Sequence, residues 1–401
     1  MKVLVVSSLY PNNANLKHGI FVHHRMKQLR AHYPEIEIKV IAPVPWFPIA
    51  SDTFGEYGRF AKAAAFEVID GIEVYHPRYL VVPKVGMQLT PLSFARAIRT
   101  TAEQIKADGF DFEMIDGHYY YPDGVALERA CRTLKVPFNV TARGTDINFI
   151  PEQSPAARQK IELVLQKTTH NLAVCKALMD TMQDDLGAPK HNAVVARNGV
   201  DLELFAYADE NQQTAQQQKL GLKSSKMILS VGHLVERKGH HLIVDAMQHI
   251  DDCELWILGA GEMRNSLEQQ IKKLGLEHKV KLLGEMTQPE MIQYYQSADC
   301  LVLASSREGW ANVLLEAMAC GTPVVATNIW GTPEVLPESD QQYLAPRSSD
   351  ALGHAIQQRL SAPSNRAYYR QHAEKFSWQA TVDLLKGVFE NTIASGKKTV
   401  S

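Results

Sequence analysis

The sequence predicts two doubly wound α/β domains that face each other across a cleft. Short apolar runs, typical of buried parallel strands, alternate with segments of helical periodicity, and this alternation occurs twice in 401 residues. A polar run at 211–218 separates the two series and is expected to be a linker. The expected domains are therefore residues 1–200 and 201–375.

The same periodicities set the expected elements in order. In the first half we expect strands at 3–6, 36–42, 112–115, 138–141, 172–175 and 193–196, with helices from about 21 and at 125–134. In the second half we expect strands at 227–231, 253–258, 280–283, 300–304 and 324–327, with helices at about 240–248, 291–298, from 311 and from 351 onward.

Composition excludes several classes of protein. The hydrophobic content of 45% and charged content of 21% are typical of a soluble globular protein. A net charge of −2 provides no global field for nucleic acid, so we expect no nucleic-acid partner. The five cysteines lack C-x-x-C spacing, and no apolar stretch reaches the ~20 residues that span a bilayer. We expect a cytoplasmic protein, with a peripheral contact at the inner face of the cell membrane as a further option.

The region 43–88 is rich in aromatic, proline and basic residues and lacks clean periodicity. Long irregular segments inside domains are often functional. Three interpretations stay open: an acceptor groove, an interfacial membrane contact, or a structured insertion that packs on its own domain. The residues concerned are Trp46, Phe47, Arg59, Lys62, Arg78 and Lys84.

Two glutamates mark the stretch around which the second half is organised. Glu308 stands in a polar loop and Glu316, eight positions later, stands in a short apolar helix that starts near Ala311. The free N–H groups at that helix start favour an anion, and each carboxylate can accept hydrogen bonds from a diol. A nucleotide-sugar has this shape. The alternative is a solvated loop glutamate and a surface helix charge.

A second polar loop follows the strand expected at 227–231. It contains Arg237 and Lys238, which are well placed after a buried strand to neutralise a pyrophosphate. The alternative is that both are solvated charges.

The first half places polar residues after its strands as well. Residues at the carboxyl ends of strands face the ligand crevice of a doubly wound sheet, and His118 is expected at such an end, although a lone histidine is more often structural than catalytic. Arg143 and Asp146 follow the next strand and could satisfy each other as a pair. Gly19 lies in a strand-to-helix connection, where backbone can approach a ligand closely.

Several of these segments resemble one family. Residues 308–316, EGWANVLLE, followed by AMACGTPVV, resemble the E-x7-E signature of the retaining GT-B glycosyltransferases of family 4, the glycosyl transferases group 1. Family members often carry Phe or Tyr where this chain has Trp310. Residues 118–124 resemble the family's H-x-x-x-P-D-G element, and residues 232–239 resemble its phosphate-binding G-x-L-x-x-x-K-G loop.

The resemblance implies a role for each half. The second domain would bind the donor, the first would bind the acceptor, and a helix at about 376–401 would return to the first domain. The implied catalytic residues are His118, Glu308, Arg237 and Lys238, and the implied acceptor-side residues are Arg143 and Asp146. The implied donor-binding residues are Gly19, Gly284, Met286, Gly309, Trp310, Ala311, Asn312, Val313, Leu314 and Glu316.

The resemblance also implies the reaction. A sugar would move with retention from a nucleoside diphosphate, uridine diphosphate before guanosine diphosphate, to a glycan or a lipid-linked acceptor. Segments SSLYPN, HGIFV and TARGTDIN look most like members that build cell-surface polysaccharides. Many glycosyltransferases hold a metal with Asp-x-Asp, which this sequence lacks, so we expect neither metal nor cofactor.

Other classes of protein compete with this expectation. A nucleotide-sugar epimerase or hydrolase of the same fold and a non-catalytic sugar-binding module are the alternatives. A dinucleotide oxidoreductase is disfavoured because Arg264 replaces the third glycine of a G-x-G-x-x-G fingerprint.

Overall fold

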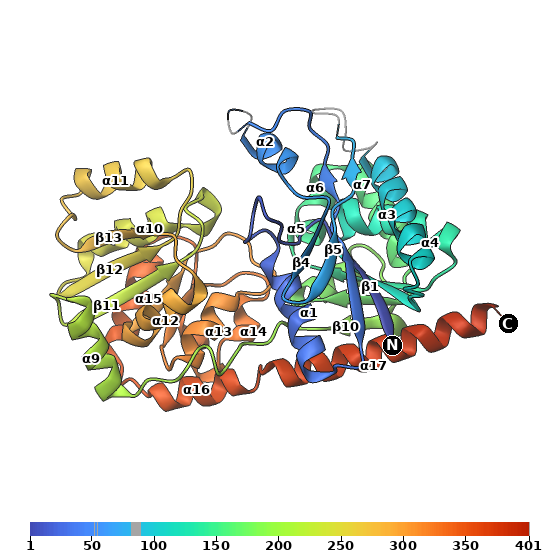
Figure 1. The fold of residues 1–401 in the computed structure, drawn as a ribbon. Helices are drawn as coiled ribbons and strands as arrows, with labels where there is room; N and C mark the ends of the chain where they lie inside the picture. The colour runs from blue at the N-terminus through green and yellow to red at the C-terminus, as the bar shows by residue number, and fades with distance from the viewer. Residues whose placement is uncertain (52, 54, 82–89, 401) are drawn as a thin grey trace. The chain divides into compact units, whose positions relative to one another are not determined.

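The computed structural model describes residues 1–51, 53, 55–81 and 90–400. Two compact units make up the chain (Figure 1). Unit 1 comprises Met1–Asn198 and Gln379–Ser401, and unit 2 comprises Gly199–Trp378. Each unit is built on its own sheet of mainly parallel strands. No helix in the described part of the chain is both long and apolar enough to cross a bilayer.

Unit 1 is built on an eight-stranded sheet in the order β10-β9-β8-β7-β1-β2-β5-β4. All neighbouring strands are parallel except β4 and β5, which are antiparallel. The strands are β1 (Lys2–Val6), β2 (Glu37–Ile41), β4 (Phe66–Ile69), β5 (Ile72–Tyr75), β7 (Met114–His118), β8 (Phe138–Ala142), β9 (His170–Ala173) and β10 (Ala193–Val195); β3 (Val44–Pro45) pairs separately with β6 (Arg78–Tyr79).

The helices of unit 1 mostly connect these parallel strands. They are α1 (Ile20–His32), α2 (Gly55–Ala61), α3 (Thr90–Ala107), the irregular turn η3 (Tyr120–Gly124), α4 (Val125–Leu134), α5 (Thr145–Asn148), α6 (Ile150–Gln153), α7 (Pro155–Leu165), α8 (Lys176–Asp184) and η4 (Lys190–Asn192). The last helix, α17 (Trp378–Val400), lies almost wholly in unit 1. Its residues Val382, Leu385 and Phe389 are fully buried in the same core as the strand residues Val3 and Val5.

Unit 2 contains a six-stranded parallel sheet in the order β13-β12-β11-β14-β15-β16. The strands are β11 (Lys226–Val231), β12 (Cys253–Leu258), β13 (Val280–Gly284), β14 (Cys300–Leu303), β15 (Val324–Thr327) and β16 (Leu344–Ala345). The helices are α9 (Glu210–Leu220), η5 (Glu236–Lys238), α10 (His240–Ala246), η6 (Met247–His249), α11 (Arg264–Lys273), α12 (Gln288–Ser297), α13 (Asn312–Ala319), α14 (Thr332–Val335), η7 (Glu338–Tyr343), α15 (Ser349–Ser361) and α16 (Arg366–Glu374).

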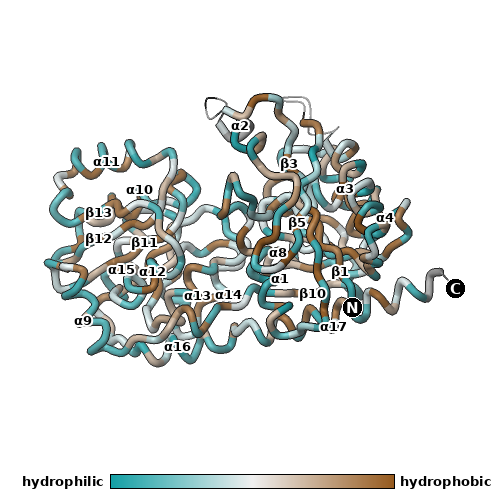
Figure 2. Tube along the Cα trace, viewed as in Figure 1, coloured by the Kyte–Doolittle hydropathy of each residue, from teal (hydrophilic) through white to brown (hydrophobic). Residues whose placement is uncertain are grey.

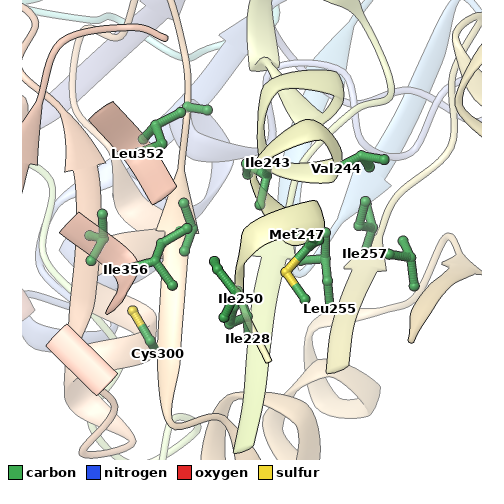
Figure 3. Packing of buried hydrophobic residues seen from close by; sticks show 14 of the residues in the cluster. Ile228, Ile243, Val244, Met247, Ile250, Leu255, Ile257, Cys300, Leu352 and Ile356 are labelled. Carbon is green, nitrogen blue, oxygen red and sulfur yellow. The ribbon is translucent and has the colours of Figure 1, made fainter. Parts of the chain in front are cut away.

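The core of unit 2 explains why its strands are continuous apolar runs. Ile228 of β11, Ile257 of β12 and Cys300 of β14 pack with Ile243 of α10 and Ile356 of α15 (Figure 3). Because helices cover the sheet, a strand residue is buried whichever face it occupies. Figure 2 shows the apolar residues concentrated along these strands, whereas the outer helices α9 and α11 are largely hydrophilic.

One sequence expectation is wrong in unit 2. The polar run 211–218, expected to be a linker, forms most of α9. A capping box begins this helix, because the Asp209 side chain accepts from Gln212 N and the Gln212 side chain accepts from Asp209 N. The Gln213 amide then donates to the carbonyls of Ser297 and Ala298. Glutamine is a good helix former, so composition alone does not distinguish a polar helix from a linker.

The described part of region 43–88 has more regular structure than its periodicity indicated. It contains β3 to β6 and α2, and β5 pairs with β2 of the main sheet, as expected of a structured insertion. Arg78 donates to the carbonyls of Phe60 and Ala63, whereas Trp46 is half exposed. Lys84 lies outside the described residues.

Strand order fixes where the functional loops meet. In unit 1 the order reverses between β1 and β7, and in unit 2 it reverses between β11 and β14. Ligands of doubly wound sheets bind outside the carboxyl ends of the strands at such switch points. The loops that follow these four strands are therefore the places to look for a site.

Candidate active site

The loops after β11 and β14 are joined by charged side chains. The Lys238 ammonium lies 2.5 Å from Glu308 Oε1, and the Ser305 hydroxyl donates to the same oxygen at 2.6 Å. The Arg237 guanidinium is 3.8 Å from this oxygen, and Ser306 N donates to Arg237 O at 2.8 Å. Three of the expected catalytic residues therefore lie together at the switch point of unit 2.

Gly239 explains why the loop after β11 can lie so close to β14. Its φ is +71°, and a Cβ there would stand 2.2 Å from the carbonyl oxygen of Ala304. Any residue other than glycine would push the loop away from the strand end. The contact between Lys238 and Glu308 therefore depends on this glycine.

The charges in this cluster do not cancel. Burial alone would raise the pKa of Glu308, but the charge of Lys238, with its hydrogen bond, outweighs burial and holds the pKa below its usual value. Glu308 is thus ionised, and one carboxylate faces two cations. The Arg237 side chain is 37% exposed, so the remaining positive charge is open to an anion.

Glu316 has different neighbours from Glu308. It lies on α13 and is 9% exposed, and its carboxylate accepts from the Tyr295 hydroxyl at 2.7 Å and from the Gln288 amide at 3.4 Å. Burial raises the pKa of this carboxyl, although both hydrogen bonds oppose the rise. The structure therefore holds the two glutamates in separate hydrogen-bond sets.

The start of α13 presents backbone N–H groups to a possible ligand. Ala311 caps the helix and has no side-chain acceptor, so no side chain of the cap covers the first-turn N–H groups. Asn312 and Val313 are half-buried and Leu314 is fully buried. The Trp310 ring is 7% exposed and packs against the ring of Phe376 at 5.6 Å.

The remaining donor-side residues lie at other places in the units. Gly284 ends β13 with φ +84°, its carbonyl accepts from Gly259 N, and half-buried Met286 follows it. In unit 1, a Cβ on Gly19 would stand 2.1 Å from the carbonyl carbon of Leu9. The close approach expected at Gly19 is therefore made by the loop's own backbone.

Two hollows in unit 2 have lining residues other than those expected in the site. One of ≈ 270 Å³ and one of ≈ 540 Å³ are lined without any of the expected site residues. The smaller is lined by Ala208, Gln212, Ala215, Gln216, Lys219 and Gln296, and the larger by Glu236, His241, Glu262, Met263, Ser266 and Gln270. Among the described residues, no three His, Cys, Asp or Glu side chains gather where they could share a metal ion.

His118 ends β7 in unit 1 and has both ring nitrogens near protein groups. Arg143 Nη2 is 2.8 Å from Nδ1, and Asp116 Oδ2 is 3.2 Å from Nε2. Because a guanidinium only donates, Nδ1 must accept and the proton of the neutral ring lies on Nε2. Burial lowers the pKa of His118 to about 4, and the charge of Arg143 adds to this against the opposing charge of Asp116. The ring is neutral at physiological pH, which suits an orienting group better than a base.

Arg143 and Asp146 interact, but not as an ion pair of two side chains. The buried Asp146 carboxylate accepts from the backbone N–H groups of Tyr120, Arg143 and Gly144. The Arg143 guanidinium instead contacts His118 and donates to Asn198 Oδ1 at 3.3 Å. Asp146 thus shapes the loop that presents Arg143.

Sequence reasoning did not single out several residues that complete these clusters. Asp116 stands two residues before His118, and the period of a strand places both on one face, so this partner was detectable. Tyr295 and Ser305 carry no pattern that marks them as partners of a glutamate. Asn198 belongs to a segment with the pattern of an ordinary turn.

Comparison with protein families covers most of the chain. Residues 212–376 match the family Glycosyl transferases group 1, and residues 53–204 match the family Glycosyltransferase Family 4. The first match contains all the charged residues of the unit 2 cluster, and the second contains His118, Arg143 and Asp146.

Individual relatives are similar over nearly their whole length. The putative teichuronic acid biosynthesis glycosyltransferase TuaC of Bacillus subtilis is 25% identical, with 89% of this chain and 88% of that protein covered. The D-inositol 3-phosphate glycosyltransferase of Corynebacterium urealyticum is 26% identical, with 86% of each covered.

Solved structures show the same fold. Sucrose-phosphate synthase from Thermosynechococcus elongatus matches with a TM-score of 0.77 at 16% identity, over 98% of this chain and 100% of that chain. Anabaena Alr3699/HepE in complex with UDP-glucose matches with a TM-score of 0.70 at 20% identity, over 97% and 99%.

The same substitution at the two glutamates is expected to change stability in opposite directions. Glu308→Gln removes the anion that pairs with Lys238, so the free energy of unfolding at pH 7 should fall by about 2 kcal/mol. Glu316→Gln removes a charge that burial disfavours, while the amide oxygen still accepts from Tyr295, so the free energy should rise. Denaturant unfolding measures both.

The pH dependence provides the control for this pair. Because the native pKa of Glu308 is lowered, its stabilising contribution is present above the unfolded value of about 4.3 and is lost as pH falls through the native value. Because the native pKa of Glu316 is raised, its penalty develops as pH rises from the unfolded value through the native one. Both differences from wild type should vanish in acid. Two variants that are both less stable at pH 7 would contradict the assignment of Glu316.

Proposed function

We propose that this chain, which belongs to the family 4 glycosyltransferases, moves a sugar from a uridine diphosphate sugar to a glycan or a lipid-linked acceptor with retention of configuration and without a metal. The observation that carries the proposal is the charge imbalance at the switch point of unit 2. There Arg237 and Lys238 face the single carboxylate of Glu308.

The chemistry needs positive charge at this place. When the bond from the anomeric carbon to the donor breaks, negative charge builds on the leaving diphosphate. Groups aimed at that charge stabilise the transition state more than the ground state. Arg237 offers a planar fork for phosphate oxygens and Lys238 a compact charge, and the first-turn amides of α13 would add dipoles. Glu308 orients Lys238 and would bind the sugar hydroxyls.

The other acidic and neutral residues would then position the ligand. Glu316 would accept hydrogen bonds from the ribose, with Tyr295 fixing the rotamer of its carboxylate. Gly284 and Met286 would border the base, and Gly309 to Leu314 would line the phosphates with backbone. In unit 1, His118 would orient a group near the reacting centre as a neutral ring.

The choice of nucleotide and acceptor is supported by relatives and not by spacing. Anabaena Alr3699/HepE was solved in complex with UDP-glucose, which supports a uridine nucleotide here. TuaC is named for teichuronic acid biosynthesis, which supports a cell-surface polysaccharide as the product. Arg143 and the loop shaped by Asp146 would lie on the acceptor side.

A screen of nucleotide-sugars tests the donor. Ligands that bind the native state raise the melting temperature by mass action, so uridine diphosphate sugars should raise it more than guanosine diphosphate sugars. Transfer should then require an added acceptor. Conversion of the sugar without an acceptor would favour an epimerase, and release of free sugar alone would favour a hydrolase. Absence of any nucleotide effect would refute the proposed donor site.

Replacing the pairing lysine tests the charge argument. Lys238→Ala should lower the turnover number about a hundredfold, because one donor aimed at developing charge contributes ~3 kcal/mol. The variant also loses the ion pair with Glu308, so its free energy of unfolding should fall by about 2 kcal/mol, and turnover is measured at a temperature at which the variant is fully folded. Lys272→Ala, on the exposed face of α11, is the matched control and should keep wild-type kinetics. Unchanged turnover in the Lys238 variant would remove this role.

The stereochemistry can be read from the product directly. Proton NMR of the first product should show the anomeric configuration of the donor, because the family that this chain resembles retains it. An inverted anomer would refute retention while leaving the donor site intact.

A further inference from the structure

We propose that unit 1 binds an acidic group of the acceptor, a carboxylate or a phosphate, through the guanidinium of Arg143. The inference rests on the proposed function, because it names the chemical class of the acceptor that this unit would receive. Three observations carry it: the contacts that fix the Arg143 side chain, the nearby guanidinium of Arg25, and the interactions of the nearby carboxylates.

Arg143 is held in one orientation from three sides. Its Nη2 lies 2.8 Å from His118 Nδ1, its Nη1 donates to Asn198 Oδ1 at 3.3 Å, and its guanidinium carbon lies 5.1 Å from the centre of the Phe21 ring. These contacts come from β7, from the last residue of the first segment of unit 1, and from α1. A side chain fixed in this way loses little entropy when it binds a ligand.

The fixed guanidinium still has donors to offer. It carries five N–H groups, and the two protein contacts use one N–H each from Nη1 and Nη2. Its Nε is buried, and no hydrogen-bond partner for it occurs in the described part of the chain. Arg143 as a residue is intermediate in exposure and not fully buried, so part of it remains within reach of a ligand. This geometry suits bidentate recognition of a carboxylate or a phosphate.

A second guanidinium makes the surroundings electropositive. Arg25 of α1 is fully buried, and its Nη2 donates at 2.7 Å to the same Asn198 Oδ1 that accepts from Arg143. Burial, followed by repulsion from Arg25, holds the pKa of Arg143 well below its usual value. An anion at Arg143 would offset the repulsion from Arg25 and favour the charged guanidinium.

Two buried carboxylates lie near these guanidinium groups. Asp146 accepts from three backbone N–H groups, but its charge still acts on Arg143. Asp116 is near both arginines, and it also lies 3.2 Å from His118 Nε2. Repulsion from Arg25 outweighs the attraction of either carboxylate for Arg143, which favours an additional anion there.

Three sugars with the same ring provide the test: glucose, glucuronate and glucose 6-phosphate. Their affinities for the full chain are measured by calorimetry with UDP at saturation, which occupies the cations of unit 2. At least one acidic sugar should bind tenfold or more tightly than glucose. The comparison of glucuronate with glucose 6-phosphate tells which acidic group Arg143 accepts.

Variants assign any preference to Arg143. Arg143→Gln should abolish the difference between acidic and neutral sugars, whereas Arg96→Gln, which removes an exposed charge from α3 of the same unit, should leave it unchanged. Arg143→Lys keeps the charge but loses the planar guanidinium that can bind two oxygens at once, so it should lose most of the preference for acidic sugars. If circular dichroism shows that the Arg143→Gln variant does not fold, the Arg143→Lys variant provides the test in its place.

The outcomes separate this inference from the proposed function. Equal binding of the three sugars to wild type, or a preference that survives in the Arg143 variants, would overturn the inference. Neither result would affect the binding of nucleotide-sugars by unit 2, which the donor screen measures independently. Failure of the donor screen would refute the donor site, and the Arg143 comparison would then be repeated in a chain carrying Arg237→Gln and Lys238→Gln, so that any remaining preference is assigned to unit 1.

Discussion

The contact between Lys238 and Glu308 is the constraint on which the site in unit 2 depends. Each residue follows a central strand, and the strands are neighbours only because the sheet order reverses between them. The carboxylate keeps the ammonium oriented and partly out of water before a ligand arrives. If the site takes the proposed diphosphate, a phosphate would meet a cation that has already lost much of its freedom and hydration, which is the sense in which a site is pre-organised.

The fold was predictable where burial is complete. The strands expected at 253–258 and 324–327 and the helix expected at 125–134 have those bounds in the structure. A strand covered on both faces is mostly apolar, which makes it easy to recognise. Strands β4 and β5 were not expected, because Phe66 and Val68 are exposed and the alternation is too short to recognise. The polar helix α9 resembles a linker in sequence because its capping box is local and its packing uses amide groups.

The sequence indicated individual residues of the candidate site but not the contacts that they make with one another. Arg237, Lys238 and Glu308 were found because polar loops follow apolar strands. Their mutual contact depends on strand order, which a single sequence does not contain. The partner of Glu316 comes from the packing of α12 on α13, and Arg25 reaches Arg143 only because the first helix lies against the end of unit 1. Such long-range pairings leave no periodic pattern in the amino-acid sequence.

Trp310 lies in the segment between Glu308 and Glu316, and its contacts matter for the construction of chimeras between related proteins. Its ring rests on Phe376, whose carbonyl accepts from Val200 N, and a Cβ on Gly199 would stand 2.7 Å from the Trp378 backbone. Residues at the two places where the chain passes between the units therefore contact each other, and Phe376, close to the second of them, contacts this tryptophan. Chimeras that exchange units between relatives should keep the motif and both passages from one parent, since a graft that mixes them would mismatch interlocked aromatic and backbone surfaces.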